Sequence, residues 1–228
     1  MQKIGFNEYY GLNRAVFTEQ KTMTRRIEKP LNNAVEMYRN SYIDRPSFNI
    51  ISQRYTERGG IELRLERDFL FVPTRYKVGE IVAVAQSYKS VFEESLNYAI
   101  PRYHWLDDHI DEKGFANKMF VKACEMPHQI RITDIKIERL QDISEEDCLK
   151  EGIIRRDDMI NSRMEDVVRY TFENSFVGGI YKTYATPREA FAALIERPGI
   201  GHKGDWSKNP WVVVYSFELV KKNIKKEV

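Results

Sequence analysis

Apolar and polar residues alternate along several short stretches of the chain, which is the pattern of strands that bury one face. Residues 48–55, a turn at 56–60 and residues 61–65 predict a hairpin. Small and β-branched residues at 81–85 and an apolar stretch at 211–219 predict two buried strands.

A longer strand is predicted around residues 130–137. Isoleucines alternate before and after Thr133 and Asp134, which break the step, so we expect a bulge there. Several strands of similar length with short helices between them favour a small barrel or a highly curved sheet over a βαβ fold. The predicted fold class is α+β with a β-barrel centre.

Three short helices are expected. One covers 7–19 with Asn7 as its cap, and a lysine and proline at 29–30 end the segment that follows it. Ser144 and the three acidic residues after it predict a second helix that ends near Gly152. Thr186 followed by proline predicts the third. Residues 31–45 show only weak periodicity.

Composition places the chain among ordinary globular proteins. Of its 228 residues, 42% are hydrophobic and 31% are charged, which excludes a disordered chain. The formal net charge is +2, so a polyanion would not be attracted from a distance and any nucleic-acid site must be local. Cys124 and Cys148 match no common zinc pattern, and we expect both to be reduced and packed.

One domain over residues 1–228 fits this length. The N-terminal segment lacks the apolar run of a signal peptide, and no stretch has the length of a membrane-spanning helix. The cytoplasm is therefore the expected compartment.

The sequence KTMTRR at 21–26 combines three cations and two hydroxyls. Such a group can hold a phosphate or a carbonyl oxygen by charge-assisted hydrogen bonds. Alone, however, it is more typical of a solvated basic turn, since charge runs usually face water.

Three blocks of the chain, in the right order, resemble the ASCH family, including its phage and prophage members. Residues 18–27 resemble the family's G-x-K-T-x-T-R-R segment, with Glu19 where glycine is common. Residues 130–153 resemble the family strand followed by LQDISEED and a helix that ends in EGI. Residues 188–214 resemble the closing helix, loop and strand. The unmatched stretches 31–74 and 88–126 are interpreted as elaborations.

This resemblance implies a PUA-like β-barrel whose cleft binds RNA, a nucleotide or a modified nucleoside. Some small members of the family are amidohydrolases that deacetylate N4-acetylcytidine, with activity attributed to a lysine, a threonine and a glutamate. By this resemblance, the three catalytic residues correspond to Lys21, Thr24 and Glu151. Glu145 and Glu146 lie close enough to Glu151 that a small shift in alignment would exchange them. A ribonuclease is a third possibility, without a histidine pair to support it.

Several other residues are candidates for nucleic-acid binding. Arg25 and Arg26 belong to the basic cluster. Phage relatives often have a charged arginine-glutamate pair before a small residue and tryptophan, where this chain has residues 85–88 without the pair. Tyr88 keeps an aromatic face that can stack on a base. We expect Lys203, in the loop at residues 199–204, and Trp206, just after it, to overhang the cleft. That loop, residues 199–204, matches G-x-G-x-x-G but lies between a helix and a strand, the reverse of a dinucleotide site.

A metal site is not expected, nor is a cofactor. His104, Asp107, Asp108 and His109 are close in sequence, but their neighbours Trp105 and Leu106 are typical of packing. We therefore favour a structural or solvated role for this group.

Overall fold

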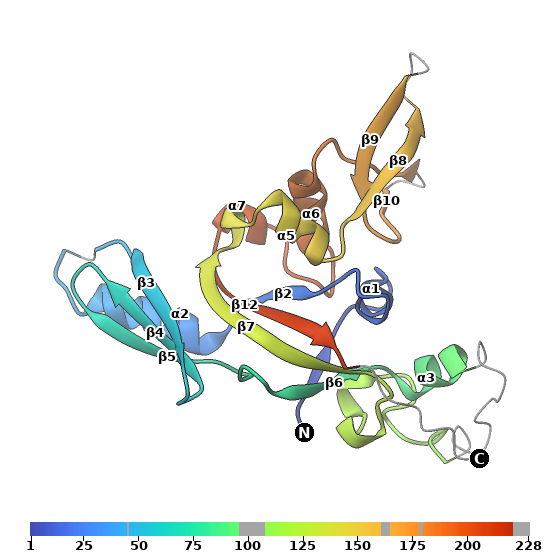
Figure 1. The fold of residues 1–228 in the computed structure, drawn as a ribbon, viewed down its shortest axis with the longest axis horizontal. Coiled ribbons are helices and arrows are strands. Elements are labelled where there is room, and N and C mark those ends of the chain that lie inside the picture. Colours follow the sequence, from blue (N-terminus) through green and yellow to red (C-terminus); the bar gives the residue numbers. More distant parts are fainter. Residues whose placement is uncertain (45, 96–107, 161–164, 178–179, 221–228) are drawn as a thin grey trace.

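The computed structural model describes residues 1–44, 46–95, 108–160, 165–177 and 180–220. The fold is α+β. Its centre is a five-stranded sheet in the order β1-β6-β7-β12-β2, in which only β1 and β6 are parallel (Figure 1). The strands of this sheet are β1 (Lys3–Gly5), β2 (Met23–Arg26), β6 (Ile81–Ala85), β7 (Gln129–Arg139) and β12 (Trp211–Leu219). Across the described residues no sheet closes on itself.

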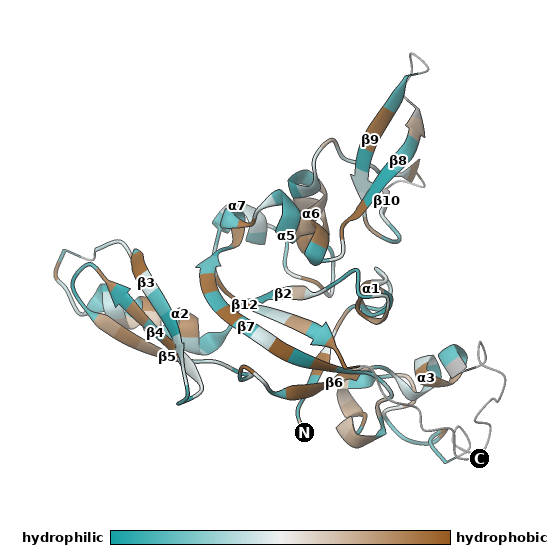
Figure 2. Cartoon of the chain, viewed as in Figure 1, coloured by the Kyte–Doolittle hydropathy of each residue, from teal (hydrophilic) through white to brown (hydrophobic). Residues whose placement is uncertain are grey.

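β7 and β12 form the longest pairing of the sheet, and the predicted bulge lies in it. Ser216 pairs with Asp134, whereas Phe217 pairs with Ile132, so Thr133 is the extra residue of β7. Figure 2 shows hydrophobic residues along β6, β7 and β12, and Val212 to Val214 are buried in succession because both faces of the sheet are covered. The predicted strands at 81–85 and 211–219 are confirmed.

A second sheet holds the predicted hairpin and lies at the end of β7 away from α3 (Tyr88–Ser95) (Figure 1). It comprises β3 (Ile50–Thr56), β4 (Gly60–Leu65) and β5 (Phe69–Pro73). The side-chain amide of Gln53 donates to the carbonyl of Ile137 at 2.8 Å and accepts from its N–H at 2.6 Å. These two bonds fix the small sheet to the central one.

Residues 29–40 correct one prediction. The lysine and proline at 29–30 do not end a segment but begin α2 (Lys29–Asn40), because proline is compatible with the first turn of a helix. Leu31, Val35 and Tyr38 are buried at helical spacing. Only these three buried residues repeat along α2, which explains why the helical periodicity of the sequence is weak here.

The N-terminal helix is shorter than predicted. The side chain of Asn7 accepts a hydrogen bond from the N–H of Tyr10, but it closes a turn rather than capping a helix. Gly11 then adopts a left-handed conformation, and α1 (Leu12–Phe17) begins after it.

The two predicted helix caps further along the chain are confirmed. Ser144 Oγ accepts from the N–H of Asp147 at the start of α5 (Glu145–Lys150), and Thr186 Oγ1 accepts from the N–H of Glu189 at the start of α6 (Pro187–Ile195). Between them lie strands that sequence reasoning did not find. These are β8 (Ile154–Ile160), β9 (Asp166–Thr171), β10 (Phe176–Val177) and β11 (Ile180–Tyr181).

The expectation for the cysteines is half wrong. Cys148 is buried in the core, whereas Cys124 is exposed, in a short helical turn at Ala123–Glu125. No helix within the described part of the chain has the length and apolar character needed to cross a membrane.

Candidate functional site

A cavity of about 790 Å³ opens beside the two edge strands of the central sheet. Its lining includes the ends of β1 and β2, Glu151 directly after α5, one side of α6 and the loop at 199–202. Arg26 of β2 donates a hydrogen bond to the carbonyl of Gly5 in β1 at 2.8 Å, so the two edges of the sheet lie close together here. Among the predicted site residues, those that line the cavity are Lys21, Thr24, Arg25, Arg26 and Glu151.

Lys21 is held at the wall of this cavity by a tight turn after α1. Its N–H donates to the carbonyl of Ala15 at 2.8 Å. Glu19, within that turn, has a φ of 60°, a left-handed conformation that glycine adopts more readily. This requirement explains why the resembled pattern has glycine at the position.

The Lys21 ammonium is almost fully buried, with 2% of the residue exposed. Its Nζ donates to Glu151 Oε2 at 2.6 Å and to the Glu151 carbonyl at 2.7 Å. Burial lowers the pKa of Lys21, and the neighbouring Glu151 charge offsets only part of that shift. A lysine in this state can lose its proton more easily than an exposed one.

Thr24 and Arg26 lie on the same face of β2, because side chains alternate along a strand. Thr24 is buried in the cavity wall, and the Arg26 guanidinium lies 5.8 Å from the ring of Phe6. Lys21 Nζ is 5.7 Å from the same ring. Phe6 therefore lies beside both cations, a role that the sequence did not indicate.

Lys21 precedes β2 and Thr24 lies within it, because Met23 to Arg26 form a strand. Thr22 does not line the cavity. Its N–H donates to the Lys150 carbonyl at 2.9 Å, and its carbonyl accepts from the N–H of Phe217 at 2.8 Å.

Glu151 is the glutamate that meets Lys21. It follows the last turn of α5, where its N–H donates to the Asp147 carbonyl at 2.9 Å. Glu145 and Glu146 are exposed on the same helix, and Glu146 pairs with Lys150 at the surface. The ambiguity among the three glutamates is resolved in favour of Glu151 as the partner of Lys21.

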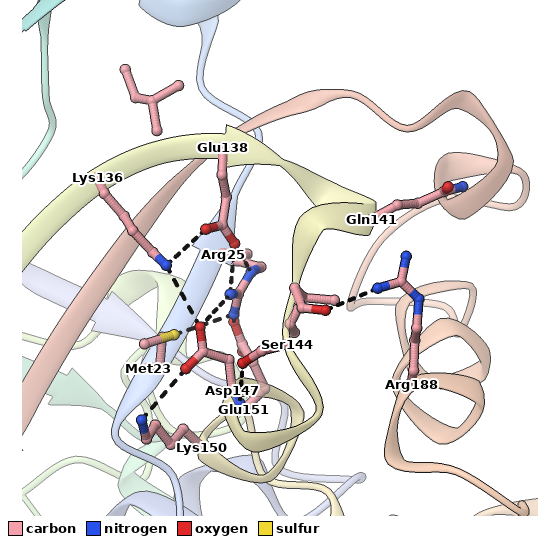
Figure 3. Close-up of polar contacts among 12 residues, drawn as sticks. Met23, Arg25, Lys136, Glu138, Gln141, Ser144, Asp147, Lys150, Glu151 and Arg188 are labelled. Carbon is pink, nitrogen blue, oxygen red and sulfur yellow. Dashed lines mark hydrogen bonds and ion pairs between the residues drawn. The ribbon is translucent and has the colours of Figure 1, made fainter. Parts of the chain in front are cut away.

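Arg25 lies on the opposite side of β2 and is enclosed by carboxylates (Figure 3). Its guanidinium donates to Glu151 Oε1 at 3.0 Å, to Glu138 Oε1 at 2.6 and 2.8 Å and to Asp147 Oδ2 at 3.1 Å. Only 1% of its side chain is exposed. The prediction that Arg25 binds nucleic acid is therefore corrected, because its donors are already used inside the protein.

Two lysines complete this network from outside. Lys136 Nζ lies 2.8 Å from Glu138 and 3.6 Å from Asp147, and Lys150 Nζ lies 3.5 Å from the other oxygen of Asp147 (Figure 3). Burial alone would raise the pKa of Asp147, but Lys136 and Arg25 outweigh it and the pKa is lowered. Sequence reasoning had treated this acidic residue only as part of a helix N-terminus.

The other nucleic-acid candidates lie outside the cavity. Tyr88 is fully buried, begins α3 and stacks on His109 with ring centroids 4.1 Å apart, so it cannot stack on a base. Trp206 lies in α7 (Asp205–Lys208) and packs edge-on against Phe191. Lys203 is exposed, and neither it nor Trp206 lines the cavity, although residues 199–202 do.

The histidine and aspartate group is only partly visible. His104 and Asp107 fall outside the described residues, Asp108 is exposed, and His109 is buried against Tyr88. Within the described ranges, no group of three histidine, cysteine, aspartate or glutamate side chains could hold a metal ion.

The cavity thus brings together a buried lysine, a carboxylate bonded to it and a threonine hydroxyl. A hydroxyl can act as a nucleophile when a neighbouring base accepts its proton, and a desolvated lysine can be that base. Comparison of the chain with protein-family models, with curated proteins and with solved structures gave no match.

Proposed function

We propose that this protein binds a nucleoside in the cavity and hydrolyses an N-acyl group on its base, with N4-acetylcytidine as the representative substrate. The observation that carries the proposal is the buried contact of 2.6 Å between Lys21 and Glu151 in the wall that Thr24 also lines. A solvated basic turn would leave the lysine exposed.

In the proposed reaction, the Thr24 hydroxyl attacks the acyl carbonyl carbon while Lys21 Nζ accepts the hydroxyl proton. The tetrahedral intermediate collapses, the carbon–nitrogen bond breaks, and Lys21 returns the proton to the departing amine. Water, deprotonated by Lys21, then attacks the threonine ester. The bond between the acyl carbon and Thr24 Oγ1 breaks, Lys21 returns the proton to Oγ1, and the carboxylic acid leaves. Glu151 orients Lys21 and stabilises its ammonium form between the steps.

We infer a PUA-like barrel of the ASCH type as the fold behind this site. The inference is supported by the bond between Arg26 and Gly5, which joins the two edge strands of the central sheet through a side chain. RNA binding is the second candidate function. It is favoured by the positive charge of the cavity, whose lining has five lysine or arginine side chains and three carboxylates in the described residues.

Hydrolysis is tested by chromatographic detection of cytidine released from N4-acetylcytidine by the purified protein. We expect Thr24→Ala and Lys21→Met each to lower turnover by about 100-fold or more. Thr22→Ala is the matched control, because Thr22 carries the same hydroxyl one residue before β2 but does not line the cavity. Its turnover should stay near wild type.

Circular dichroism of each variant separates loss of chemistry from loss of fold. Absence of cytidine release by the wild-type protein would reject hydrolysis of this substrate. An active Thr24→Ala variant would reject the nucleophile. If hydrolysis is absent but labelled RNA binds in a salt-dependent way that Arg26→Ala weakens, RNA binding becomes the function of the cavity.

A further inference from the structure

The lysine and arginine side chains of the cavity differ in whether they form ion pairs with carboxylates of the protein. Lys21 and Arg25 are bonded to carboxylates inside the protein. Within the described part of the chain, neither Arg26 nor Arg75 forms an ion pair with a carboxylate. Among the described residues, the cavity cations without a carboxylate partner are therefore Arg26, Arg75 and the exposed Lys29.

The backbone of Arg75 is fixed at this side. Its N–H donates to the Tyr215 hydroxyl at 3.1 Å, and its carbonyl accepts from the side chain of Gln2 at 3.1 Å. The residue itself is exposed, and its guanidinium lies 5.5 Å from the ring of Tyr76. A fixed backbone with a free guanidinium is suited to receive a ligand from solvent.

In the described residues the carboxylates of the cavity form no ion pair with these two arginines, although the charge of Glu28 acts on both. Glu28 accepts a hydrogen bond from the Tyr215 hydroxyl at 2.7 Å, and Asp205 accepts from the N–H of His202 at 2.7 Å. Glu151 is bonded to Lys21 and Arg25. All three are thus held by partners within the protein.

Arg26 adds a further donor. Its Nε is buried without a hydrogen-bond partner among the described residues, although its Nη2 donates to Gly5. Burial lowers the pKa of Arg26, and the nearby positive charge of Arg75 acts in the same direction. Two like charges held close together with an unused donor are stabilised when an anion binds between them.

We propose that Arg26 and Arg75 form a phosphate subsite, so that the ligand of the cavity is a nucleoside monophosphate rather than a free nucleoside. Arg26 is two residues from Thr24 on the same face of β2, about 7 Å along the strand. The base therefore lies at Thr24 and Lys21, and the sugar phosphate lies at Arg26 and the exposed Arg75. This subsite rests on the proposed nucleoside cavity, but not on its catalysis.

Binding of cytidine and of cytidine 5′-monophosphate, measured by calorimetry at low salt, tests the subsite. We expect the monophosphate to bind about tenfold more tightly or better, since hydrogen bonds to a charged group are strong. Arg75→Ala should remove most of this preference, because it should weaken binding of the monophosphate far more than binding of cytidine. The matched control is Arg58→Ala, because Arg58 is also exposed beside a ring, 5.0 Å from Phe71, but lies outside the cavity.

Equal affinity of the wild type for the two ligands would overturn the subsite, as would a similar loss of preference in Arg58→Ala and Arg75→Ala. A cytidine dinucleotide with only an internal phosphodiester is the third probe. Tighter, Arg75-dependent binding of this probe than of the monophosphate would assign the phosphate to an RNA chain and overturn the mononucleotide.

The outcomes for binding and for catalysis are separable. Hydrolysis of N4-acetylcytidine without a preference for the monophosphate would retain the proposed reaction and reject the subsite. A preference for the monophosphate that depends on Arg75, with no hydrolysis, would retain the subsite and reject the reaction.

Discussion

Arg25 Nη1 lies 3.0 Å from Glu151 Oε1 and so holds the carboxylate whose other oxygen bonds to Lys21. The residue that the sequence presents as a surface cation is thus an internal one, which fixes the orientation of Glu151. Because Arg25 also bonds to Glu138 and Asp147, it ties β7 and α5 to β2.

Removal of Arg25 should destabilise the fold strongly. Arg25→Ala would leave the carboxylates of Glu138, Asp147 and Glu151 without their shared cation, and breaking a buried ion pair costs about 3–5 kcal/mol. Urea unfolding gives the change in the free energy of unfolding. Arg54→Ala is the control, because its pair with Glu62 at 2.7 Å is exposed and should contribute about 0–1 kcal/mol. Equal effects of the two substitutions would contradict this account of the network.

The buried Lys21 should make stability depend on alkaline pH. Its folded pKa is lowered from 10.5, so between the folded value and 10.5 the unfolded chain binds more protons. The free energy of unfolding of the wild type, relative to Lys21→Met, should therefore rise as pH rises through that window. Urea unfolding of both proteins from about pH 7 to pH 10 measures the difference. A difference that does not change with pH would mean that the pKa of Lys21 is not lowered.

Gly152 should resist substitution for two reasons that can be separated. Its φ is 100°, and a Cβ would lie 3.2 Å from Leu12 Cδ2 and 3.7 Å from Lys21 Cδ. Gly79 has a similar φ of 82° with nothing within 4 Å of its Cβ position. Both alanine variants should lose about 1–2 kcal/mol through backbone strain. Only Gly152→Ala should lose more, because the contact of 3.2 Å requires Leu12 to move. Equal losses in unfolding free energy would show that the contact with Leu12 is unimportant.

The two cysteines should differ sharply in reactivity. Burial raises the pKa of Cys148 to about 12, whereas Cys124 is exposed. Because the thiolate is the reactive form, a maleimide should modify Cys124 in the native protein and reach Cys148 only after denaturation. Mass spectrometry of the labelled peptides, with Cys124→Ser as control, measures this. Rapid native labelling of Cys148 would indicate that α5 opens.

The sequence by itself determined those elements whose cause is local. Ser144 and Thr186 cap their helices because their hydroxyls reach backbone donors three residues away, and Thr133 forms the bulge because the apolar alternation shifts there. The hairpin at 48–65 followed from alternation and turn residues alone. Lys21, Thr24 and Glu151 were named from a short resembled pattern, and the structure brings all three to one cavity.

Tertiary structure decided what each charged residue does. Arg25 and Arg26 are adjacent in sequence, but strand alternation points them to opposite faces of β2. Arg25 therefore bonds to three carboxylates, whereas Arg26 bonds to the Gly5 carbonyl. Tyr88 could have faced a ligand, yet a helix start and His109 bury it. Arg75 gave no signal, because its place depends on Tyr215, which is 140 residues away in the chain. Contacts between distant segments follow from packing of the whole core, which no local pattern encodes.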